Sequence, residues 1–292
     1  MAVRERDPVS GHMTTGHEWN GIKELNTPVP RVAWLFLIAT ALFAVLFWIL
    51  MPAWPLGTHY TRGLLGVDQK HDVARKLDAS AARKAGWADR IAALDVPAIR
   101  ADPALMAIVR EDGHRLFGDN CAACHGVTAK GGKGFPDLTD ADWLWGNGDA
   151  QAVAHTIEVG VNSGAPDARV SQMLAFGRDG ILDNDAILAV TDYVLALSDP
   201  AAARGRAASV KAGARIFADN CAACHGPDGH GNPELGIPNL SDRHWLYGGD
   251  AQSVYTSIHG GRQGVMPAWA ERLSPVERKI LTAYVLDLGV RP

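Results

Sequence analysis

The segment Phe-x-Asp-Asn-Cys-Ala-Ala-Cys-His-Gly occurs twice in this chain of 292 residues, at 117–126 and at 217–226. The Cys-x-x-Cys-His pattern inside it is the attachment sequence of c-type haem. Two thiols three residues apart can bond to the two vinyl groups of one porphyrin, and the adjacent histidine reaches the iron from the proximal side. The repeat therefore predicts two covalently bound c-type haems, and it uses all four cysteines of the chain.

Each copy of the motif assigns two thioether cysteines and one iron ligand. These residues are Cys121, Cys124 and His125 for the first haem and Cys221, Cys224 and His225 for the second. Other interpretations of a Cys-x-x-Cys pair are weaker. A thioredoxin-like redox pair lies between a strand and a helix and is not repeated. A zinc site has its second cysteine pair within roughly twenty residues, which is far closer than the spacing between these copies.

An uncharged apolar stretch at 32–51 precedes the repeat. Twenty helical residues span about 30 Å, the hydrocarbon thickness of a bilayer. Three tryptophans near its ends resemble an aromatic belt: Trp34, Trp48 and Trp54. A cleaved signal peptide would have an apolar region of roughly 7–15 residues close to the N-terminus. This stretch is longer and begins after thirty residues, so we predict a retained membrane anchor.

The segments on either side of the anchor differ in character. Residues 1–31 are polar and show no periodic apolar face, which predicts a short exposed tail. Residues 67–99 are rich in Ala, Lys, Arg and Asp with an approximate helical stripe, which predicts one or two linker helices that end at Pro97. Lysines and arginines are balanced across the anchor. Because haem is attached outside the cytoplasm, we expect the N-terminus in the cytoplasm and everything after Pro55 outside.

The repeat extends beyond the haem motif and indicates a duplicated domain. Matching positions are Leu138, Trp143 and Gly148 in the first copy and Leu240, Trp245 and Gly249 in the second. A glycine one turn before the phenylalanine of each motif resembles the first helix of the class I cytochrome c fold. In that fold the glycine permits close crossing by the last helix, and an aromatic residue of that helix packs there. The candidates are Tyr193 in a helix at 185–197 and Tyr284 in a helix at 275–288.

The predicted fold class is all-α, with one N-terminal transmembrane helix followed by two tandem class I cytochrome c domains. The expected parts are a cytoplasmic tail at 1–31, a transmembrane helix at 32–54, periplasmic linker helices at 55–102, a first cytochrome c domain at 103–198, a linker at 199–209 and a second cytochrome c domain at 210–292. Trp143 and Trp245 are expected in the cores of these domains.

Each iron needs a second axial ligand, and methionine is the candidate. Only two of the six methionines follow the first haem motif, and Met173 and Met266 stand in matching contexts before the closing helices. Class I cytochromes c carry their methionine ligand there. The histidines in this region have no equivalent in the other copy. The sequence leaves open whether Met173 and Met266 ligate the haems of their own halves or are exchanged between them.

The N-terminal part carries a resemblance to a known family. A tail that reads HEWNGIKELNTPVP at 17–30, a membrane helix, a GLLG stretch at 63–66 and two Cys-Ala-Ala-Cys-His domains closely resemble the dihaem cytochrome c subunit of cbb3-type cytochrome c oxidases (subunit III, CcoP or FixP). The resemblance covers nearly the whole chain. The tail is its most specific part, because haem motifs alone occur in many cytochromes.

The resemblance implies a non-catalytic electron-transfer subunit of an oxidoreductase complex in the bacterial inner membrane. Such a subunit spans the lipid once, accepts electrons from a soluble or membrane-bound cytochrome c, and relays them with a monohaem cytochrome subunit toward the haem–copper catalytic subunit that reduces oxygen. The order of the haems, their potentials, the donor and the roles of Trp143 and Trp245 are left open.

Composition and motif content bear on the alternatives. The formal net charge of −4 argues against nucleic acid as a partner. From residue 101 onward, 16 Lys and Arg face 23 Asp and Glu, which suits a basic redox partner or simply keeps the domains soluble. The main rival is a membrane-anchored dihaem cytochrome c that serves a periplasmic dehydrogenase. A dihaem peroxidase would need an open iron, whereas both halves offer a methionine, and a gas sensor would need a signalling domain.

Overall fold

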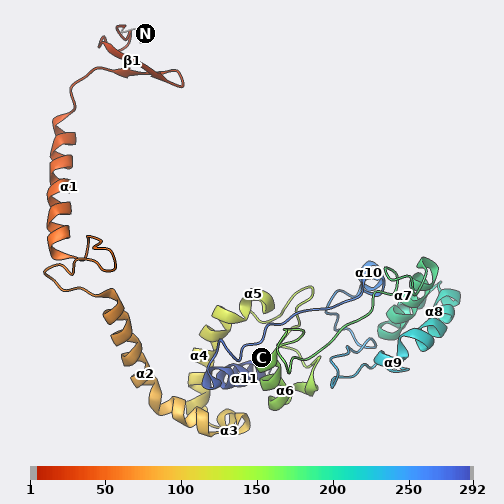
Figure 1. The fold of residues 1–292 in the computed structure, drawn as a ribbon. Coiled ribbons are helices and arrows are strands. Elements are labelled where there is room, and N and C mark those ends of the chain that lie inside the picture. The colour runs from red at the N-terminus through yellow and green to blue at the C-terminus, as the bar shows by residue number, and fades with distance from the viewer. Residues whose placement is uncertain (1–4, 290–292) are drawn as a thin grey trace. The chain divides into compact units, whose positions relative to one another are not determined.

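The computed structural model describes residues 5–289 and divides the chain into two compact units, 1–83 and 84–292. Figure 1 shows the element order, in which a small hairpin and the apolar helix come first and the other helices follow. Helix α2 runs across the boundary between the units. The helices far outnumber the strands in the described part of the chain, in agreement with the predicted all-α class.

The tail contains a β-hairpin that the sequence prediction lacks. Strand β1 (Thr14–Trp19) pairs antiparallel with β2 (Ile22–Leu25). The two residues between the strands, Asn20 and Gly21, have φ angles of 52° and 85°. Positive φ at both central positions is the requirement of a type I′ turn, for which Asn-Gly is the favoured sequence. That dipeptide was the signal that could have predicted the hairpin.

Helix α1 (Arg31–Leu50) is the predicted anchor, and it begins one residue before the uncharged stretch. It buries no side chain, and among the described residues it is the one helix long and apolar enough to cross a membrane. The chain then folds back on its end. The backbone N–H groups of Leu64 and Leu65 donate to the carbonyls of Ile49 and Leu50, at 2.9 and 3.0 Å. These bonds satisfy carbonyls that a helix end leaves without intrahelical partners.

Two helices occupy the segment in which linker helices are expected, and Pro97 has a different role from the predicted one. Helix α2 (Gln69–Ala93) ends before it, and Pro97 lies in the first turn of α3 (Val96–Ala101). The sequence prediction that Pro97 ends a helix is therefore wrong. Proline is well tolerated in a first turn because its missing N–H has no intrahelical partner there. Asp95 caps the same turn by accepting from the N–H of Ala98 at 2.8 Å.

The second unit repeats one set of helices. In the first copy these are α4 (Pro103–Asn120), α5 (Ala122–His125), the 3₁₀ turn η1 (Gly146–Gly148), α6 (Ala150–Val159) and the closing helix α7 (Asn184–Ser198). After the 3₁₀ turn η2 (Pro200–Ala203), the second copy has α8 (Ala207–Asn220), α9 (Ala222–His225), α10 (Ala251–Gly260) and α11 (Pro275–Leu288). Side chains cap α4, α6, α7, α10 and α11 at their N-termini, including a capping box between Ser274 and Glu277 at α11.

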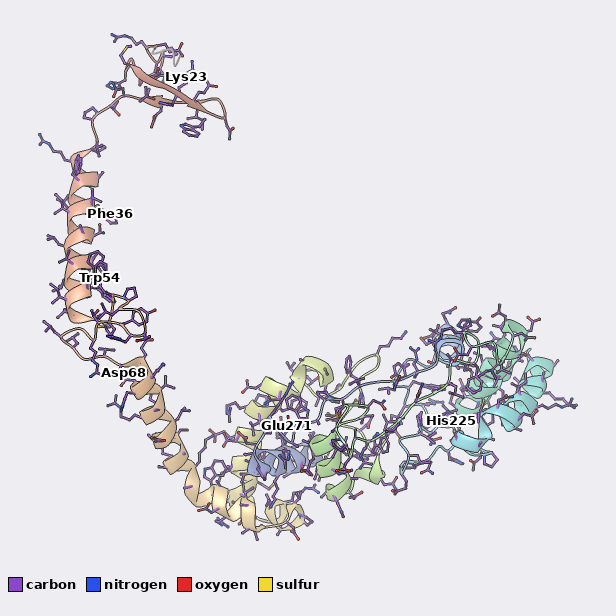
Figure 2. All side chains as sticks on the ribbon, in the orientation of Figure 1. Lys23, Phe36, Trp54, Asp68, His225 and Glu271 are labelled. Atoms are coloured by element: carbon purple, nitrogen blue, oxygen red, sulfur yellow. The ribbon has the colours of Figure 1, made fainter. Side chains whose placement is uncertain are left out.

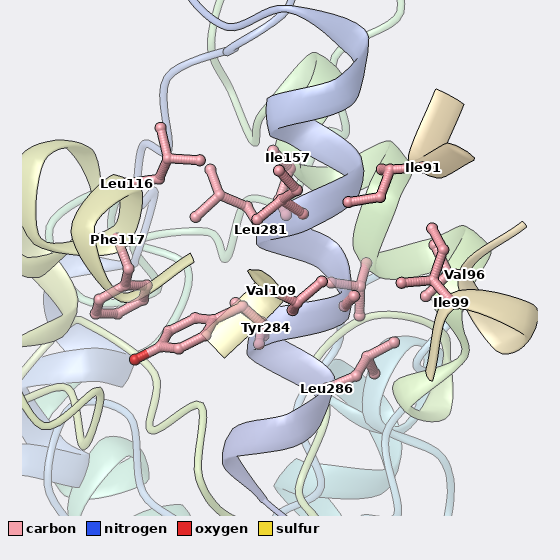
Figure 3. Packing of buried hydrophobic residues seen from close by; sticks show 14 of the residues in the cluster. Ile91, Val96, Ile99, Val109, Leu116, Phe117, Ile157, Leu281, Tyr284 and Leu286 are labelled. Atoms are coloured by element: carbon pink, nitrogen blue, oxygen red, sulfur yellow. The ribbon is translucent and has the colours of Figure 1, made fainter. Parts of the chain in front are cut away.

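The closing helix of each copy packs against the helices of the other copy. Helix α7 packs against α8 and α10 of the second copy, whereas α11 packs against α4 and α6 of the first. The ring centres of Tyr284 in α11 and Phe117 lie 5.8 Å apart, and those of Tyr193 in α7 and Phe217 lie 5.2 Å apart. Figure 3 shows α11 crossing the first core beside Phe117. The expected sequence units at 103–198 and 210–292 thus interlock.

The glycines before the haem motifs permit these crossings. A Cβ added at Gly113 would lie 2.8 Å from the side chain of Tyr284, and one at Gly213 would clash with the carbonyl of Ala189 in α7. Side chains of ordinary size therefore cannot be accommodated without displacing a helix. This confirms the close crossing that the glycine spacing predicts, although each crossing helix belongs to the other half.

Replacing Gly213 by alanine is expected to destabilise the second core by about 1–3 kcal/mol, the usual cost of forcing an extra methyl into a packed contact. The matched control is Gly118→Ala in α4, where an added Cβ meets nothing within 4 Å. That control should gain up to about 1 kcal/mol from helix propensity. Chemical denaturation of the two variants measures the difference. Equal stability of both variants would contradict the crossing of α7 over Gly213.

Two candidate haem-binding sites

Each haem motif lies on the short turn that follows a long helix. The N–H of Cys121 donates to Phe117 at the end of α4, and the N–H of His125 donates to Cys121 at 3.0 Å. The side-chain amide of Asn120 donates to the carbonyl of Leu116 at 2.8 Å and so ties the turn to α4. Gly126 then has a φ of 75°, which ends the turn. The second copy has the same bonds at the same positions.

The ring of each motif histidine is held by a backbone carbonyl oxygen at Nδ1. The Nδ1 of His125 lies 3.1 Å from the carbonyl oxygen of Pro136, and that of His225 lies 3.2 Å from the carbonyl oxygen of Pro238. A carbonyl only accepts, so Nδ1 carries the proton and Nε2 keeps its lone pair for a metal. Burial lowers the pKa of both imidazoles, which favours the neutral form that binds iron.

The cysteines are free thiols placed for attachment. All four are unpaired, and Cys121 and Cys221 are partly buried while Cys124 and Cys224 are exposed. Burial, with a smaller effect of the neighbouring cysteine, raises the pKa of Cys121 and Cys221 to about 11. These two thiols therefore stay protonated at neutral pH, which limits oxidation to a disulfide before haem is added.

Each methionine packs in the core that contains the haem motif of the other half. Met266 packs against the first core together with Cys121 and Trp143. In the same way, Met173 packs against the second core beside Cys221 and Trp245. The sequence left open whether these methionines are exchanged, and the packing brings each one to the motif of the other half. Trp143 and Trp245 are partly buried against the cores, the place expected for them.

Backbone pairing holds each methionine in the opposite half. Met266 and Val161 exchange two hydrogen bonds, both 2.9 Å long, and Met173 and Arg262 exchange two of 2.8 and 3.1 Å. A Cβ on Gly160 would clash with the carbonyl of Met266, and one on Gly261 would lie 2.6 Å from that of Met173. Both glycines also have a φ of 70°. These positions permit only glycine because another backbone passes directly against them.

Two arginine–aromatic pairs, which the sequence reasoning missed, lie where the halves meet, one pair within each half. The guanidinium of Arg169 lies 4.6 Å from the ring centre of Trp145, and that of Arg262 lies 4.3 Å from Tyr247. Each ring also contacts the other half. A Cβ added at Gly236 would clash with the ring of Trp145, and one at Gly134 would lie 3.4 Å from Tyr247. The alignment of Trp-Leu-Trp at 143–145 with Trp-Leu-Tyr at 245–247 was the available signal.

A cavity of about 370 Å³ also lies between the halves. Its lining combines Trp143 and Asn147 of the first half with Ile237 and Pro238 of the second. Pro238 accepts the hydrogen bond from His225, so the cavity adjoins the second motif. The donor set fits haem c in both halves: two free thiols, a neutral imidazole with Nε2 available, and a thioether in the same core.

An acidic cluster lies where the two halves meet. Ligand-type atoms of Asp142, Asp242 and His244 lie within 4.8 Å of one another. Burial, and next the charge of Asp242, raise the pKa of Asp142. Burial is also the first cause of the raised pKa of Asp140. Both shifts mean that the folded protein disfavours ionisation of these carboxyl groups.

Because the pKa of Asp142 is raised, the free energy of unfolding should depend on pH. A carboxyl group whose folded pKa is raised stabilises the fold below its unfolded pKa, near 3.8, and that contribution is lost as pH rises through the folded pKa. We therefore expect Asp142→Asn to gain stability relative to wild type between pH 4 and pH 7. Urea denaturation at both pH values measures the gain. A constant difference between variant and wild type at the two pH values would contradict the raised pKa.

Comparisons with known families agree with this geometry. The family model for the N-terminal domain of cytochrome oxidase-cbb3, FixP, matches residues 11–58, which include the hairpin and α1. The cytochrome c model matches residues 110–198. The model for cytochrome c oxidase, cbb3-type, subunit III, matches residues 208–285. The cytochrome c domains indicate haem c as the cofactor.

Relatives match over nearly the full length. A cbb3-type cytochrome c oxidase subunit FixP from Bradyrhizobium sp. (strain ORS 278) is 49% identical over 288 residues, with 98% of this chain and 97% of the relative covered. The FixP subunit of Bradyrhizobium diazoefficiens is 47% identical over the same shares. The CcoP subunit of Azospirillum sp. (strain B510) is 42% identical over 99% of both chains. The chain therefore belongs to the FixP/CcoP family of cbb3-type cytochrome c oxidase subunits.

Proposed function

We propose that this chain binds two haems c and relays electrons from a cytochrome c donor toward the haem–copper catalytic subunit of a cbb3-type oxidase. The observation that supports it most directly is the paired arrangement in the second unit. Each Cys-x-x-Cys-His motif shares a core with a methionine from the other half, and both halves have the same donor set. Two closed sites of one kind suit electron transfer, whereas a peroxidase needs one open iron.

The proposed assignment gives each haem ligands from both halves. Cys121 and Cys124 would hold the first haem, with His125 and Met266 on its iron. Cys221 and Cys224 would hold the second, with His225 and Met173. Haem c, when bound, supplies an iron that takes up and releases one electron. The protein's part is to fix the two ligands, because a His/Met pair raises the potential and needs no proton exchange.

The exchange gives the two sites a structural connection. The segment that carries Met266 hydrogen-bonds to the segment after α6, and the one that carries Met173 to the segment after α10. Both ligand loops therefore belong to one interlocked body. A rigid frame of this kind keeps the two sites at a constant separation, which favours transfer between them.

The membrane arrangement is part of the proposal. Helix α1 would cross the bacterial inner membrane once, with the N-terminus in the cytoplasm and both haem sites in the periplasm. The catalytic subunit and a monohaem cytochrome subunit would be its partners in the membrane, and the net charge of −7 after residue 100 would favour a basic donor. A dihaem cytochrome that serves a periplasmic dehydrogenase would share the haem sites but not the N-terminal match.

The test is purification of the tagged protein from its native membranes in mild detergent. We expect b-type haem and oxygen uptake to co-purify with the chain, and reduced-minus-oxidised spectra to show haem c in addition. A preparation with haem c alone, no oxygen uptake and a co-purifying dehydrogenase would contradict the oxidase assignment.

A further inference from the structure

We propose that the tip of the β1–β2 hairpin inserts Trp19 and Ile22 into the headgroup region of the bilayer, on the side where α1 begins. The proposal rests on the membrane anchoring by α1 that the proposed function includes. It assigns a lipid contact to a part of the chain that lies outside the membrane-spanning helix.

The hairpin tip presents an apolar pair to solvent. Trp19 and Ile22 are 69% and 74% exposed, and they are cross-strand partners in the antiparallel register. Cross-strand partners point to the same face of a hairpin. The next pair along the strands, Glu18 and Lys23, therefore points to the opposite face, because successive side chains alternate. The tip thus has one apolar face and one charged face.

Backbone hydrogen bonds tie the hairpin to the chain segments on either side of it. Asn26 donates its N–H to Met13 at 2.7 Å, and Thr14 donates its own to Glu5 at 2.8 Å, so the flanking chain is tied to the strands. Thr14 is 1% exposed. Glu5 also forms an ion pair with Lys23, which lies on the charged face and is labelled in Figure 2. Lys23 on the charged face has an intramolecular partner, whereas the indole of Trp19 is largely exposed to solvent.

The tether between hairpin and anchor keeps the tip near the bilayer. Only the five residues 26–30 separate β2 from α1, and two of them are prolines. Five extended residues reach at most about 18 Å. The polar zone on each side of the hydrocarbon core is about 5–8 Å thick. The base of the hairpin is therefore held within reach of that zone, and a strand of six residues adds about 20 Å of further reach to the tip.

The side chains at the tip suit the membrane interface. Tryptophan is enriched there because its ring has an apolar body and a polar N–H. Within the hairpin, residues 14–25, Glu18 and Glu24 outnumber the single Lys23, so attraction to anionic lipid would not hold the hairpin at the surface. Burial of apolar area is the remaining driving force. We therefore expect insertion into uncharged phosphatidylcholine as well as into mixtures with phosphatidylglycerol.

Site-directed spin labelling of the full haem-loaded chain in phosphatidylcholine nanodiscs tests the proposal. Single labels are placed by Ile22→Cys at the apolar face, Glu18→Cys at the charged face and Leu42→Cys within α1. The native cysteines do not react once they are bonded to haem. Power saturation compares collisions with oxygen, which partitions into lipid, and with a water-soluble nickel chelate. We expect the oxygen-to-nickel ratio at position 22 to be several-fold above that at position 18.

The outcomes separate the hairpin from the anchor. A lipid-like ratio at position 42 with equal, water-like ratios at 22 and 18 would overturn the hairpin proposal and leave the anchoring intact. A water-like ratio at position 42 would overturn the anchoring itself. Protection of position 22 from both reagents would indicate a protein contact in place of lipid, and would also overturn the proposal.

A second variant tests the role of the pair. Trp19→Ser in the Ile22→Cys background should lower the oxygen-to-nickel ratio at position 22, because the label loses its apolar neighbour on the same face. Thr15→Ser is the matched control away from the tip and should leave the ratio unchanged. The spectral line shape at position 22 shows whether the hairpin remains ordered. An unchanged ratio after Trp19→Ser, with an ordered line shape, would contradict insertion by the pair.

Discussion

Met266→Ala is expected to lower the reduction potential of the haem attached at Cys121 and Cys124 and to leave the other haem near its native value. The reason is the packing of Met266 against the first core, beside Cys121. Loss of a thioether ligand removes the effect that raises the potential of His/Met cytochromes. We expect a fall on the order of 0.1 V or more, well inside the range of about 0.8 V that axial ligands control. Spectroelectrochemical titration of the full chain measures both haems.

The matched control for this variant is Met106→Ala. Met106 is 4% exposed in the same core but lies on α4, away from the ligand loops. Its truncation should cost about 2–5 kcal/mol of stability through the cavity it leaves, without loss of a thioether–iron absorption band. Loss of a band in Met106→Ala, or retention of both bands in Met266→Ala, would contradict the assigned ligand.

Replacement of both Cys221 and Cys224 by alanine is expected to halve the covalently bound haem, from two per chain to one. Without thioether bonds, His225 alone holds the second haem too weakly for it to survive denaturing electrophoresis. The same variant should be less stable, because haem would fill the space beside Met173 in the second core. Mass spectrometry and haem staining measure the stoichiometry.

The spacer position offers the control for the motif. Ala223 lies between the two cysteines and is exposed, so Ala223→Ser should keep both haems and the native stability. The account would be contradicted if the double cysteine variant still carried two bound haems, or if the spacer variant lost one.

Much of the fold followed from local sequence signals. The helix predicted at 275–288 is α11, the one predicted at 185–197 lies within α7, and side chains of Ser274 and Asp183 cap these two helices. These features depend on interactions between residues that are close together in the sequence. The hairpin had an equally local signal in Asn20-Gly21, but its strands lack the apolar alternation by which strands are usually recognised.

The exchange of closing helices could not be read from the repeat itself. Gly113 and Gly213 are equivalent, and so are Tyr193 and Tyr284, so either pairing satisfies the same small-to-aromatic contact. A different feature favours the observed pairing. Helix α7 ends at Ser198 and α8 begins at Ala207, and short connections of this kind make consecutive helices antiparallel neighbours. Once α7 packs on α8, only α11 remains to close the first half.

The contacts near the junction of the halves were also beyond the sequence. Arg169 and Arg262 stand at unremarkable positions, and their aromatic partners in the same half lie more than ten residues away. The cluster of Asp142 and Asp242 likewise joins two loops that are one hundred residues apart. Periodicity describes which face of an element is buried, whereas these contacts depend on how the two halves interlock.

A background with one haem separates the contributions of the two methionine ligands. In Cys221→Ala/Cys224→Ala only the first haem remains, so Met266→Ala and Met173→Ala can be compared without overlapping signals. We expect Met266→Ala to remove the thioether–iron band of the remaining haem and Met173→Ala to leave it. If Met173→Ala removes the band and Met266→Ala does not, each methionine serves its own half and the exchange is wrong.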